Sequence, residues 1–149
     1  MIFPMYIGKQ FYEGSTKDYR DVISPATGEI IGQIPMGSAE DADKAIKEAK
    51  KAVPVLENMS VFERAELCVR VSDAIAKRRE ELAKLLCKEH GKPYHSEAIG
   101  EVDGCILAFK EAAEQIKWIN DEIIPLHDKN KRAFVYRKPL GACPRIQNN

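Results

Sequence analysis

The feature that most constrains the fold is a long run of helical periodicity in the middle of the chain. Between residues 38 and 120, apolar residues recur every three or four positions, the spacing of one face of an α-helix. Ser38 and Ser60 are each followed three positions later by an acid, the pattern of a helix N-terminal capping box. The sequence therefore predicts a mostly helical body with strand-like segments before and after it.

Proline, glycine and a basic cluster divide this body into four predicted helices. The first is predicted to stop at Pro54, because proline has no N–H and clashes with the preceding turn. The second ends or bends at residues 77–79, where one lysine and two arginines stand together. The third has Gly91 in the position of a C-terminal cap. The fourth and longest covers roughly residues 96–120.

The fourth predicted helix contains two glycines one turn apart. Gly100 and Gly104 each cost about 1 kcal/mol relative to alanine in a helix interior. A neighbouring backbone that approaches closely would explain them, and so would a plain surface groove. Cys68 on the second helix and Cys105 on the fourth are expected to be inert core residues. The predicted apolar face of the fourth helix consists of Ala98, Val102, Cys105, Ile106, Phe109, Ala112, Ala113 and Ile116.

Strand-like segments lie at both ends of the chain. Residues 5–7 and 10–12 flank Gly8-Lys9, a spacing typical of a hairpin, and residues 22–23 and 30–34 flank a Pro- and Gly-containing turn. Residues 132–137 alternate as a half-exposed strand that needs a partner. The expected fold is α+β and mostly helical, with N-terminal β-hairpins, about four helices and one C-terminal strand. We divide it into a β-hairpin region (1–37), a helical region (38–122), a strand region (123–143) and a divergent tail (144–149).

Composition narrows the class of protein. Of the 149 residues, 44% are hydrophobic and 31% charged, and a chain of this length can bury roughly 70% of its unfolded surface. The 23 basic residues balance the 23 acidic ones, which argues against a nucleic-acid partner, although a basic face balanced by an acidic one stays open. No targeting segment and no apolar run of ~20 residues is visible, so we expect no membrane partner and a cytoplasmic location. Four widely spaced cysteines make a disulfide framework unexpected.

Candidate chemistry is sparse. Cys87, His90 and His95 could ligate zinc, but a fourth ligand is not nearby in sequence, and His90 is equally explained as a helix C-terminal residue. Glu97 and Glu101 lie one helical turn apart and could act as an acid–base pair, although a solvated helix face explains them as well. A Gly-x-Gly-x-x-Gly turn and a P-loop are both absent. We assign no catalytic, cofactor-binding or metal-binding residue.

Five short motifs follow one another in an order that resembles a known family. Residues 6–11 (YIGKQF) look like that family's opening "YIGGEW", and residues 24–29 (SPATGE) match its "NPATGE" turn with Ser24 in place of asparagine. Residues 89–93 (EHGKP) match "E-x-GKP", residues 97–104 resemble the helix start that follows, and residues 137–141 (RKPLG) match "R-x-PLG". Together they resemble the N-terminal part of the aldehyde dehydrogenase superfamily over about residues 5–143.

The resemblance implies an activity that these residues do not carry. The family oxidises aldehydes to carboxylic acids with NAD or NADP, through a cysteine nucleophile and a glutamate that activates water. Those residues and the glycine-rich cofactor turn come later than "PLG", so none can be carried over, and Cys143 is too early to be the nucleophile. The segment from Pro144 departs from the buried strand that the family continues with. We therefore expect a truncated NAD(P)-dependent aldehyde dehydrogenase, from a frameshift, early stop or split gene, which binds no cofactor and is inactive by itself.

Two further interpretations stay open. The resemblance places residues 132–137 in the family's subunit-association region, so the chain could be an interaction module that forms a homo-oligomer or pairs with a separately encoded remainder of the enzyme. An unpaired strand edge and helices without a covering layer would favour such association. An unrelated helical binding module is the third interpretation.

Overall fold

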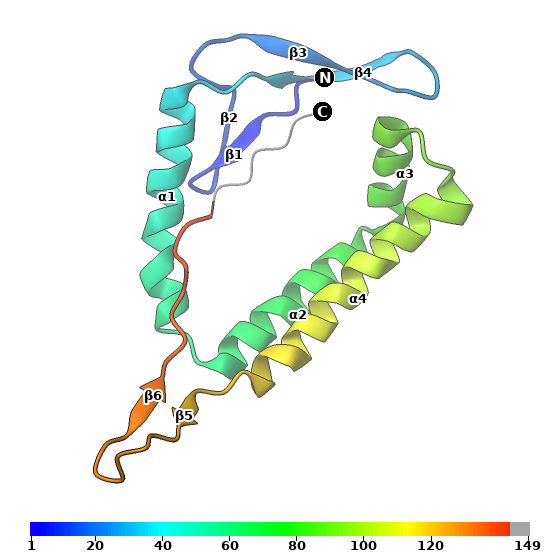
Figure 1. Ribbon diagram of the computed structural model, residues 1–149. Coiled ribbons are helices and arrows are strands. Elements are labelled where there is room, and N and C mark those ends of the chain that lie inside the picture. The colour runs from blue at the N-terminus through cyan, green and yellow to red at the C-terminus, as the bar shows by residue number, and fades with distance from the viewer. Residues whose placement is uncertain (144–149) are drawn as a thin grey trace.

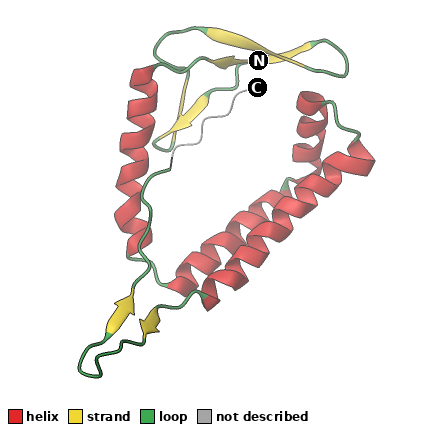
Figure 2. Cartoon of the chain, in the orientation of Figure 1, coloured by secondary structure: helices red, strands yellow, loops and turns green. Residues whose placement is uncertain are grey.

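Four α-helices and three short strand pairs form an open frame. The computed structural model describes residues 1–143, and Figure 1 shows α1 on one side, the α2–α4 pair on the other and the first strands across the top. Figure 2 shows the strands confined to the two ends of the chain. The elements are β1 (Met5–Ile7), β2 (Gln10–Tyr12), β3 (Tyr19–Ile23), β4 (Ile30–Pro35), α1 (Ala39–Glu57), α2 (Val61–Lys77), α3 (Arg79–His90), the π-helix η1 (Tyr94–Ala98), α4 (Ile99–Gln115), the 3-10 helix η2 (Ile116–Trp118), β5 (Glu122–Ile124) and β6 (Ala133–Val135).

The N-terminal strands form the two predicted hairpins. β1 pairs antiparallel with β2 around Gly8 and Lys9, whose φ angles of 61° and 67° are those that a tight two-residue hairpin turn requires. β3 pairs antiparallel with β4, and Ile2 adds a parallel bridge to Gln33. Gly32 leaves room for this N-terminal segment, because a Cβ there would lie 2.2 Å from the Phe3 ring.

Both predicted helix caps are present. The Ser38 hydroxyl accepts from the Asp41 N–H at 3.1 Å, and the Ser60 hydroxyl accepts from the Glu63 N–H at 3.2 Å. In each case the acid accepts in return from the N–H of the serine, so two N–H groups that the helix cannot pair are satisfied. These local patterns fix where α1 and α2 begin.

The predicted stop at Pro54 is wrong, because α1 continues through it to Glu57. Proline removes a single helical hydrogen bond, and Pro54 lies in the last turn on an exposed part of the helix, where water can satisfy the freed carbonyl. Asn58 then closes the helix, with its backbone N–H 3.1 Å and its side-chain amide 2.8 Å from the Pro54 carbonyl oxygen. Pro54 therefore does not shorten α1.

The tightest packing joins α2, α3 and α4. Ser72 of α2 is fully buried and donates to the Ile106 carbonyl of α4 at 2.8 Å. The buried apolar residues are all small or medium-sized: Ala65, Ala83, Ala98, Val102 and Ala113. Small side chains let the helix backbones approach closely, and they leave a thin core.

Several residues predicted to be buried face solvent instead. Cys105 and Ala112 of α4 are exposed. α4 packs on one side, against α2 and α3, so only a narrow stripe of its predicted apolar face is covered. Gly100 and Gly104 have nothing within 4 Å of an added Cβ, which favours the groove explanation over a close backbone contact.

The C-terminal strand has a partner within the chain, which corrects the prediction of one lone strand. β5 pairs antiparallel with β6, with Ile123 opposite Phe134. Pro125 follows the first of these strands directly, so the sequence shows no clear strand pattern at residues 122–124. The N–H and C=O groups on one edge of β6 are therefore satisfied without a second chain. The divergent tail, 144–149, lies outside the described residues.

The chain exposes far more surface than a closed domain of its size. Its accessible area is 11906 Å², whereas a compact monomer of this mass exposes about 7,600 Å². It buries roughly half of its unfolded surface rather than the roughly 70% expected from its length. No helix within residues 1–143 combines the length and the apolar character needed to cross a membrane.

Candidate functional site

Two of the recognised motifs meet in space. The 24–29 turn is closed by hydrogen bonds from the Gly28 N–H to the Ser24 carbonyl at 2.8 Å and from the Ser24 N–H to the Glu29 carbonyl at 2.9 Å. Gly91, which ends α3 with a φ of 69°, lies against this turn, and an added Cβ would be 3.0 Å from Pro25 Cγ. The motifs therefore form a contact that joins the strand layer to the helices.

A buried carboxylate organises the start of α1. Asp41 is 3% exposed and accepts from the backbone N–H groups of Ser38 at 3.0 Å and Ser15 at 3.2 Å, and from both serine hydroxyls at 3.0 Å. The Ser38 N–H is the largest cause that holds the pKa of Asp41 far below its ordinary value. With every partner a donor to the charged form, Asp41 is a structural anion and a poor proton carrier.

Two carboxylates of α4, one of them the candidate Glu101, are paired with cations. Glu101 pairs with Lys92, and Asp103 accepts from Arg79 Nε at 2.6 Å and Nη2 at 2.5 Å, which lowers the pKa of Asp103. These pairs tie α3 and the turn after it to α4. Glu101 is thus held in an ion pair, and no hydrogen bond joins it to Glu97 among the described residues.

The candidate zinc ligands are not brought together. Within residues 1–143, no three His, Cys, Asp or Glu side chains converge as metal ligands. Cys87, His90 and His95 therefore do not form a metal site in this structure. His95 instead packs edge-on against Tyr94, with ring centroids 4.9 Å apart. No hydrogen bond joins a cysteine to a histidine or a carboxylate in this part of the chain, and Cys143 Sγ lies 3.8 Å from the Gly141 carbonyl.

The hollows on the surface are open grooves. One of about 480 Å³ lies between β3 and the end of α3 and is lined by Asp21, Glu89 and His90 among others. Another of about 640 Å³ separates the β1–β2 turn from α1 and is lined mainly by alanines and aliphatic residues. Neither groove combines a nucleophile with a base, so neither suggests an acyl- or hydride-transfer site.

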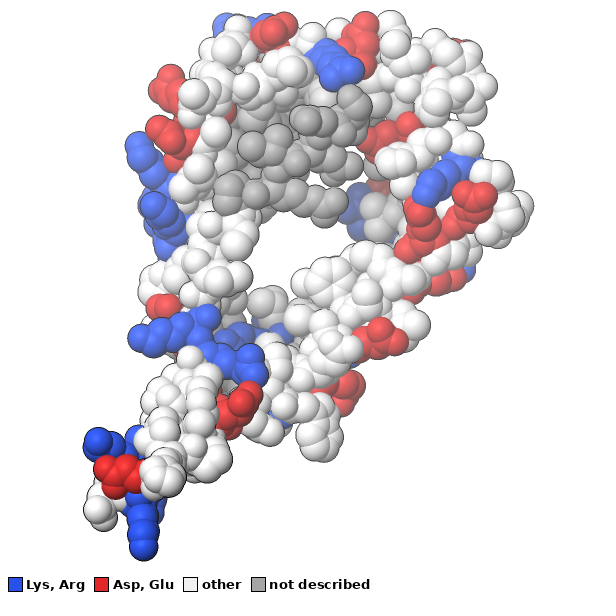
Figure 3. All heavy atoms as spheres, viewed as in Figure 1, with Lys and Arg blue, Asp and Glu red and all other residues white. Residues whose placement is uncertain are grey.

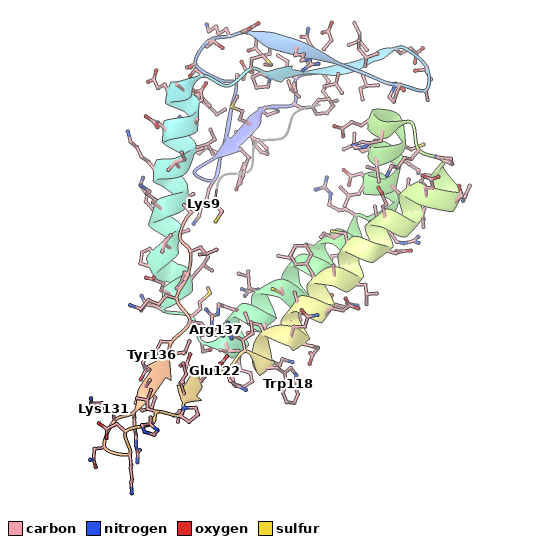
Figure 4. All side chains as sticks on the ribbon, in the orientation of Figure 1. Lys9, Trp118, Glu122, Lys131, Tyr136 and Arg137 are labelled. Atoms are coloured by element: carbon pink, nitrogen blue, oxygen red, sulfur yellow. The ribbon has the colours of Figure 1, made fainter. Side chains whose placement is uncertain are left out.

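The β5–β6 hairpin projects away from the rest of the frame. Arg137 holds its base through the Glu122 carboxylate at 3.0 Å and the Asn120 carbonyl at 3.4 Å. Figure 4 labels Arg137 and Glu122 at this place. Trp118 is 79% exposed, and Ile123 and Tyr136 are 70% and 66% exposed. Lysine and arginine side chains gather at the hairpin tip in the space-filling view, where Lys131 lies (Figure 3).

Two polar features were missed by sequence reasoning. Ser15 joins Asp41 across 26 positions, which no local pattern reveals. Arg64 is half-buried, and its Nε is shielded from solvent without a hydrogen-bond partner among the described residues. Its position one turn before Cys68, which was expected to be a core residue, was the available signal.

Comparisons with known proteins agree with the motif order. The sequence profile of the aldehyde dehydrogenase family matches residues 11–147. Malonate-semialdehyde dehydrogenase 2 of Bacillus mycoides is 37% identical over 141 residues, which are 95% of this chain and 29% of that protein. Lactaldehyde dehydrogenase of Methanocaldococcus jannaschii is 37% identical over 81% of this chain and 26% of that protein.

The solved structures agree as well. Succinate-semialdehyde dehydrogenase from Burkholderia pseudomallei superposes with a TM-score of 0.87 and 31% identity, over 94% of this chain and 29% of that one. The chain thus spans little more than a quarter of the length of these relatives. Motif order, sequence profile and backbone geometry all agree, and the chain belongs to the aldehyde dehydrogenase family.

Proposed function

We propose that this chain supplies the N-terminal scaffold of an NAD(P)-dependent aldehyde dehydrogenase and does not oxidise aldehydes by itself. The observation that carries the proposal is the span of the match, which takes in 95% of this chain and 29% of the Bacillus mycoides relative. The candidate nucleophiles and bases within residues 1–143 lie apart or are engaged in structural contacts. The reaction is therefore assigned to polypeptide beyond these residues.

The turn from β4 to α1 does not fit a dinucleotide phosphate. Two related solved structures are titled as complexes with NAP and with nicotinamide adenine dinucleotide, and cofactor phosphates commonly bind at the helix N-terminus of a strand-to-helix turn. Here the turn from β4 to α1 has its helix N-terminus filled by Ser38 and the buried Asp41 carboxylate, which would repel a phosphate. We therefore propose that the cofactor of the whole enzyme binds outside this segment.

A partner that covers the open frame follows from its surface. The area beyond that of a compact monomer is about 4,300 Å², several times the ~800 Å² that one partner contributes to a standard interface. Half-exposed Phe134 and the exposed Ile123 and Tyr136 place apolar surface on the β5–β6 hairpin. We assign this surface to the remaining polypeptide of the enzyme, with a second copy as the alternative occupant at the hairpin.

The compartment we infer is the cytoplasm. All four cysteines are free, and reduced thiols are typical of proteins that fold in a reducing compartment. Names of the relatives range from malonate-semialdehyde to lactaldehyde dehydrogenase, so the activity we propose for the whole enzyme is aldehyde oxidation as a class.

An activity assay tests the scaffold proposal directly. The purified 149-residue chain is incubated with propanal or malonate semialdehyde and either NAD or NADP, and NAD(P)H is followed at 340 nm. We expect no turnover above that of a mock preparation from the same host. Stoichiometric, saturable turnover that co-purifies with the chain through two further columns would show that it carries a complete active site, and the scaffold proposal would fail.

Self-association is the second candidate function, favoured by the exposed apolar hairpin. Light scattering coupled to size exclusion gives the mass of the particle over a tenfold range of concentration. A mass that is a multiple of 16.8 kDa and falls when Ile123 and Phe134 are both changed to Ser supports association through the hairpin. A sharp monomer peak at every concentration would count against it.

A further inference from the structure

A shielded donor without an acceptor lies in the first turns of α2. Arg64 is half-buried, its Nε–H has lost contact with solvent, and no hydrogen-bond acceptor meets it among residues 1–143. None of the ion pairs of the described residues includes Arg64. Native proteins pair nearly all such groups, because a desolvated donor without an acceptor is costly.

The position of Arg64 follows from the register of α2 and α4. The hydrogen bond from Ser72 to Ile106 sets the two antiparallel helices level at those residues. Eight residues back along α2 and eight forward along α4 are about 12 Å each, which sets Arg64 level with Glu114. Figure 1 shows that this end is the corner where the α1–α2 turn, the end of α4 and β5 converge.

Three acids at this corner already have other partners. Glu63 accepts from the Ser60 N–H at 2.7 Å, Glu114 pairs with Lys117 at 2.7 Å, and Glu122 pairs with Arg137 at 3.0 Å. Each of these contacts is local to its own element or hairpin. The Nε–H therefore stays open to an acceptor from polypeptide outside residues 1–143.

Two other arginines show what kind of acceptor suits an Nε–H. Arg78 binds Glu81 through Nε at 2.8 Å and Nη2 at 2.6 Å, and Arg79 binds Asp103 through the same two nitrogens. In this side-on arrangement one carboxylate takes two parallel hydrogen bonds from one edge of the guanidinium. The free Nε of Arg64 is half of the same donor pair.

We propose that Arg64 binds, side-on, an Asp or Glu carboxylate of the polypeptide that completes the enzyme. The identity of this binding partner is argued from length. The related chain that superposes with a TM-score of 0.87 is matched over only 29% of its length, so most of that polypeptide lies outside the match. The inference rests on the proposed scaffold function and goes beyond it by naming the residue and the chemistry of the contact. In this proposal Arg64 is a positioning residue, because it contacts protein and not substrate.

The test compares the isolated chain with the assembled pair. The full 149-residue chain is co-expressed with the portion of the Bacillus mycoides relative that follows the matched segment, and the dissociation constant of the purified pair is measured by titration. Arg64→Met is compared with Arg64→Lys and with Arg70→Met, a control at an exposed arginine of the same helix. The melting temperature of each isolated variant is measured in parallel.

We expect Arg64→Met to weaken the pair about 30-fold or more, since it strands a desolvated carboxylate, and Arg70→Met by less than about threefold. Arg64→Lys should lose most of the same affinity, because an ammonium cannot make the two-nitrogen contact. The isolated Arg64→Met chain should melt within about 2 °C of the wild type, since the donor has no partner to lose there.

Three results would overturn the inference. Equal binding by Arg64→Met and Arg70→Met removes the contact, wild-type binding by Arg64→Lys removes its side-on geometry, and a large loss of melting temperature in the isolated Arg64→Met chain makes Arg64 an internal structural residue. A wild-type chain that does not bind the complementary polypeptide would instead overturn the scaffold function, and with it this inference. That outcome is distinct because it is seen before any variant is compared.

Discussion

The helical layer of α2, α3, η1 and α4 and the β5–β6 hairpin are stabilised in different ways. The helices pack through fully shielded small residues such as Ala83 and Ala98, and a buried hydrogen bond links Ser72 to Ile106. The hairpin keeps Ile123 70% exposed and is held at its base by the exposed pair of Arg137 and Glu122. The helices therefore supply their own stability, whereas the hairpin presents surface that another polypeptide would bury.

The largest expected effect tests the helical side of this comparison. Ala83→Leu adds three carbons at a fully buried position between α3 and α4, and we expect a loss of about 2–3 kcal/mol in the free energy of unfolding from overpacking. Ala108→Leu on the exposed side of α4 is the matched control, expected to stay within about 0.5 kcal/mol. Urea unfolding followed by circular dichroism measures both, and equal effects would mean that these helices do not form a tight core.

The next effect tests whether the strand layer is truly joined to the helices. Gly91→Ala places a Cβ 3.0 Å from Pro25 in a left-handed backbone conformation, and we expect a loss of about 1–2 kcal/mol. Gly28→Ala is the control with the same backbone cost, at a φ of 73°, and nothing within 4 Å. The excess of the first loss over the second measures the contact between the two motif turns. Equal losses would mean that this contact adds nothing to the free energy of unfolding.

A smaller effect concerns the polar start of α1 and depends on pH. Because the folded-state pKa of Asp41 lies below its ordinary value of 3.8, its charge stabilises the fold fully above that pH, and this contribution is lost as the pH falls further. Asp41→Asn should therefore be less stable than wild type at pH 7, although the amide oxygen still accepts one hydrogen bond. Thermal melts from pH 7 to 2.5 should show the difference shrinking below about pH 4.

The control for this prediction is Asp43→Asn, at an exposed acid that follows Asp41 in the first turns of α1. It should track the wild type across the same range. A constant gap between Asp41→Asn and wild type down to pH 2.5 would show that the charge of Asp41 contributes nothing to stability and that the loss comes from its shape alone.

The smallest effect tests the hairpin side of the comparison. Arg137→Met removes an exposed ion pair, for which we expect at most about 0.5 kcal/mol in global stability. Amide hydrogen exchange should nevertheless speed up in β5 and β6 while α2 and α4 stay protected, because the hairpin opens locally. Arg132→Met, in the loop beside β6, is the control. Faster exchange throughout α4 would mean that hairpin and helices unfold as one unit.

Local chemistry explains what the sequence could predict. Both capping boxes, the Gly8-Lys9 turn and the cap at Gly91 depend on residues within a few positions of one another, and the structure contains all of them. The order of the motifs identified the family, because residue identities and their order can be read directly from the sequence. The predicted stop at Pro54 failed because the cost of a proline depends on its place in the helix and on solvent, which its identity alone does not report.

Residues from distant positions explain what could not be predicted. The sequence by itself determined where α1 and α2 begin and where the first hairpin turns, since each depends on short-range hydrogen bonds and backbone angles. It also contains the family's motifs, which are recognised by residue identity and order. The tertiary structure alone decided that β5 pairs with β6, that Ser15 reaches Asp41, and that Arg64 is shielded without an acceptor. Those outcomes depend on which surfaces meet and which stay open, and burial is a property of the assembled chain.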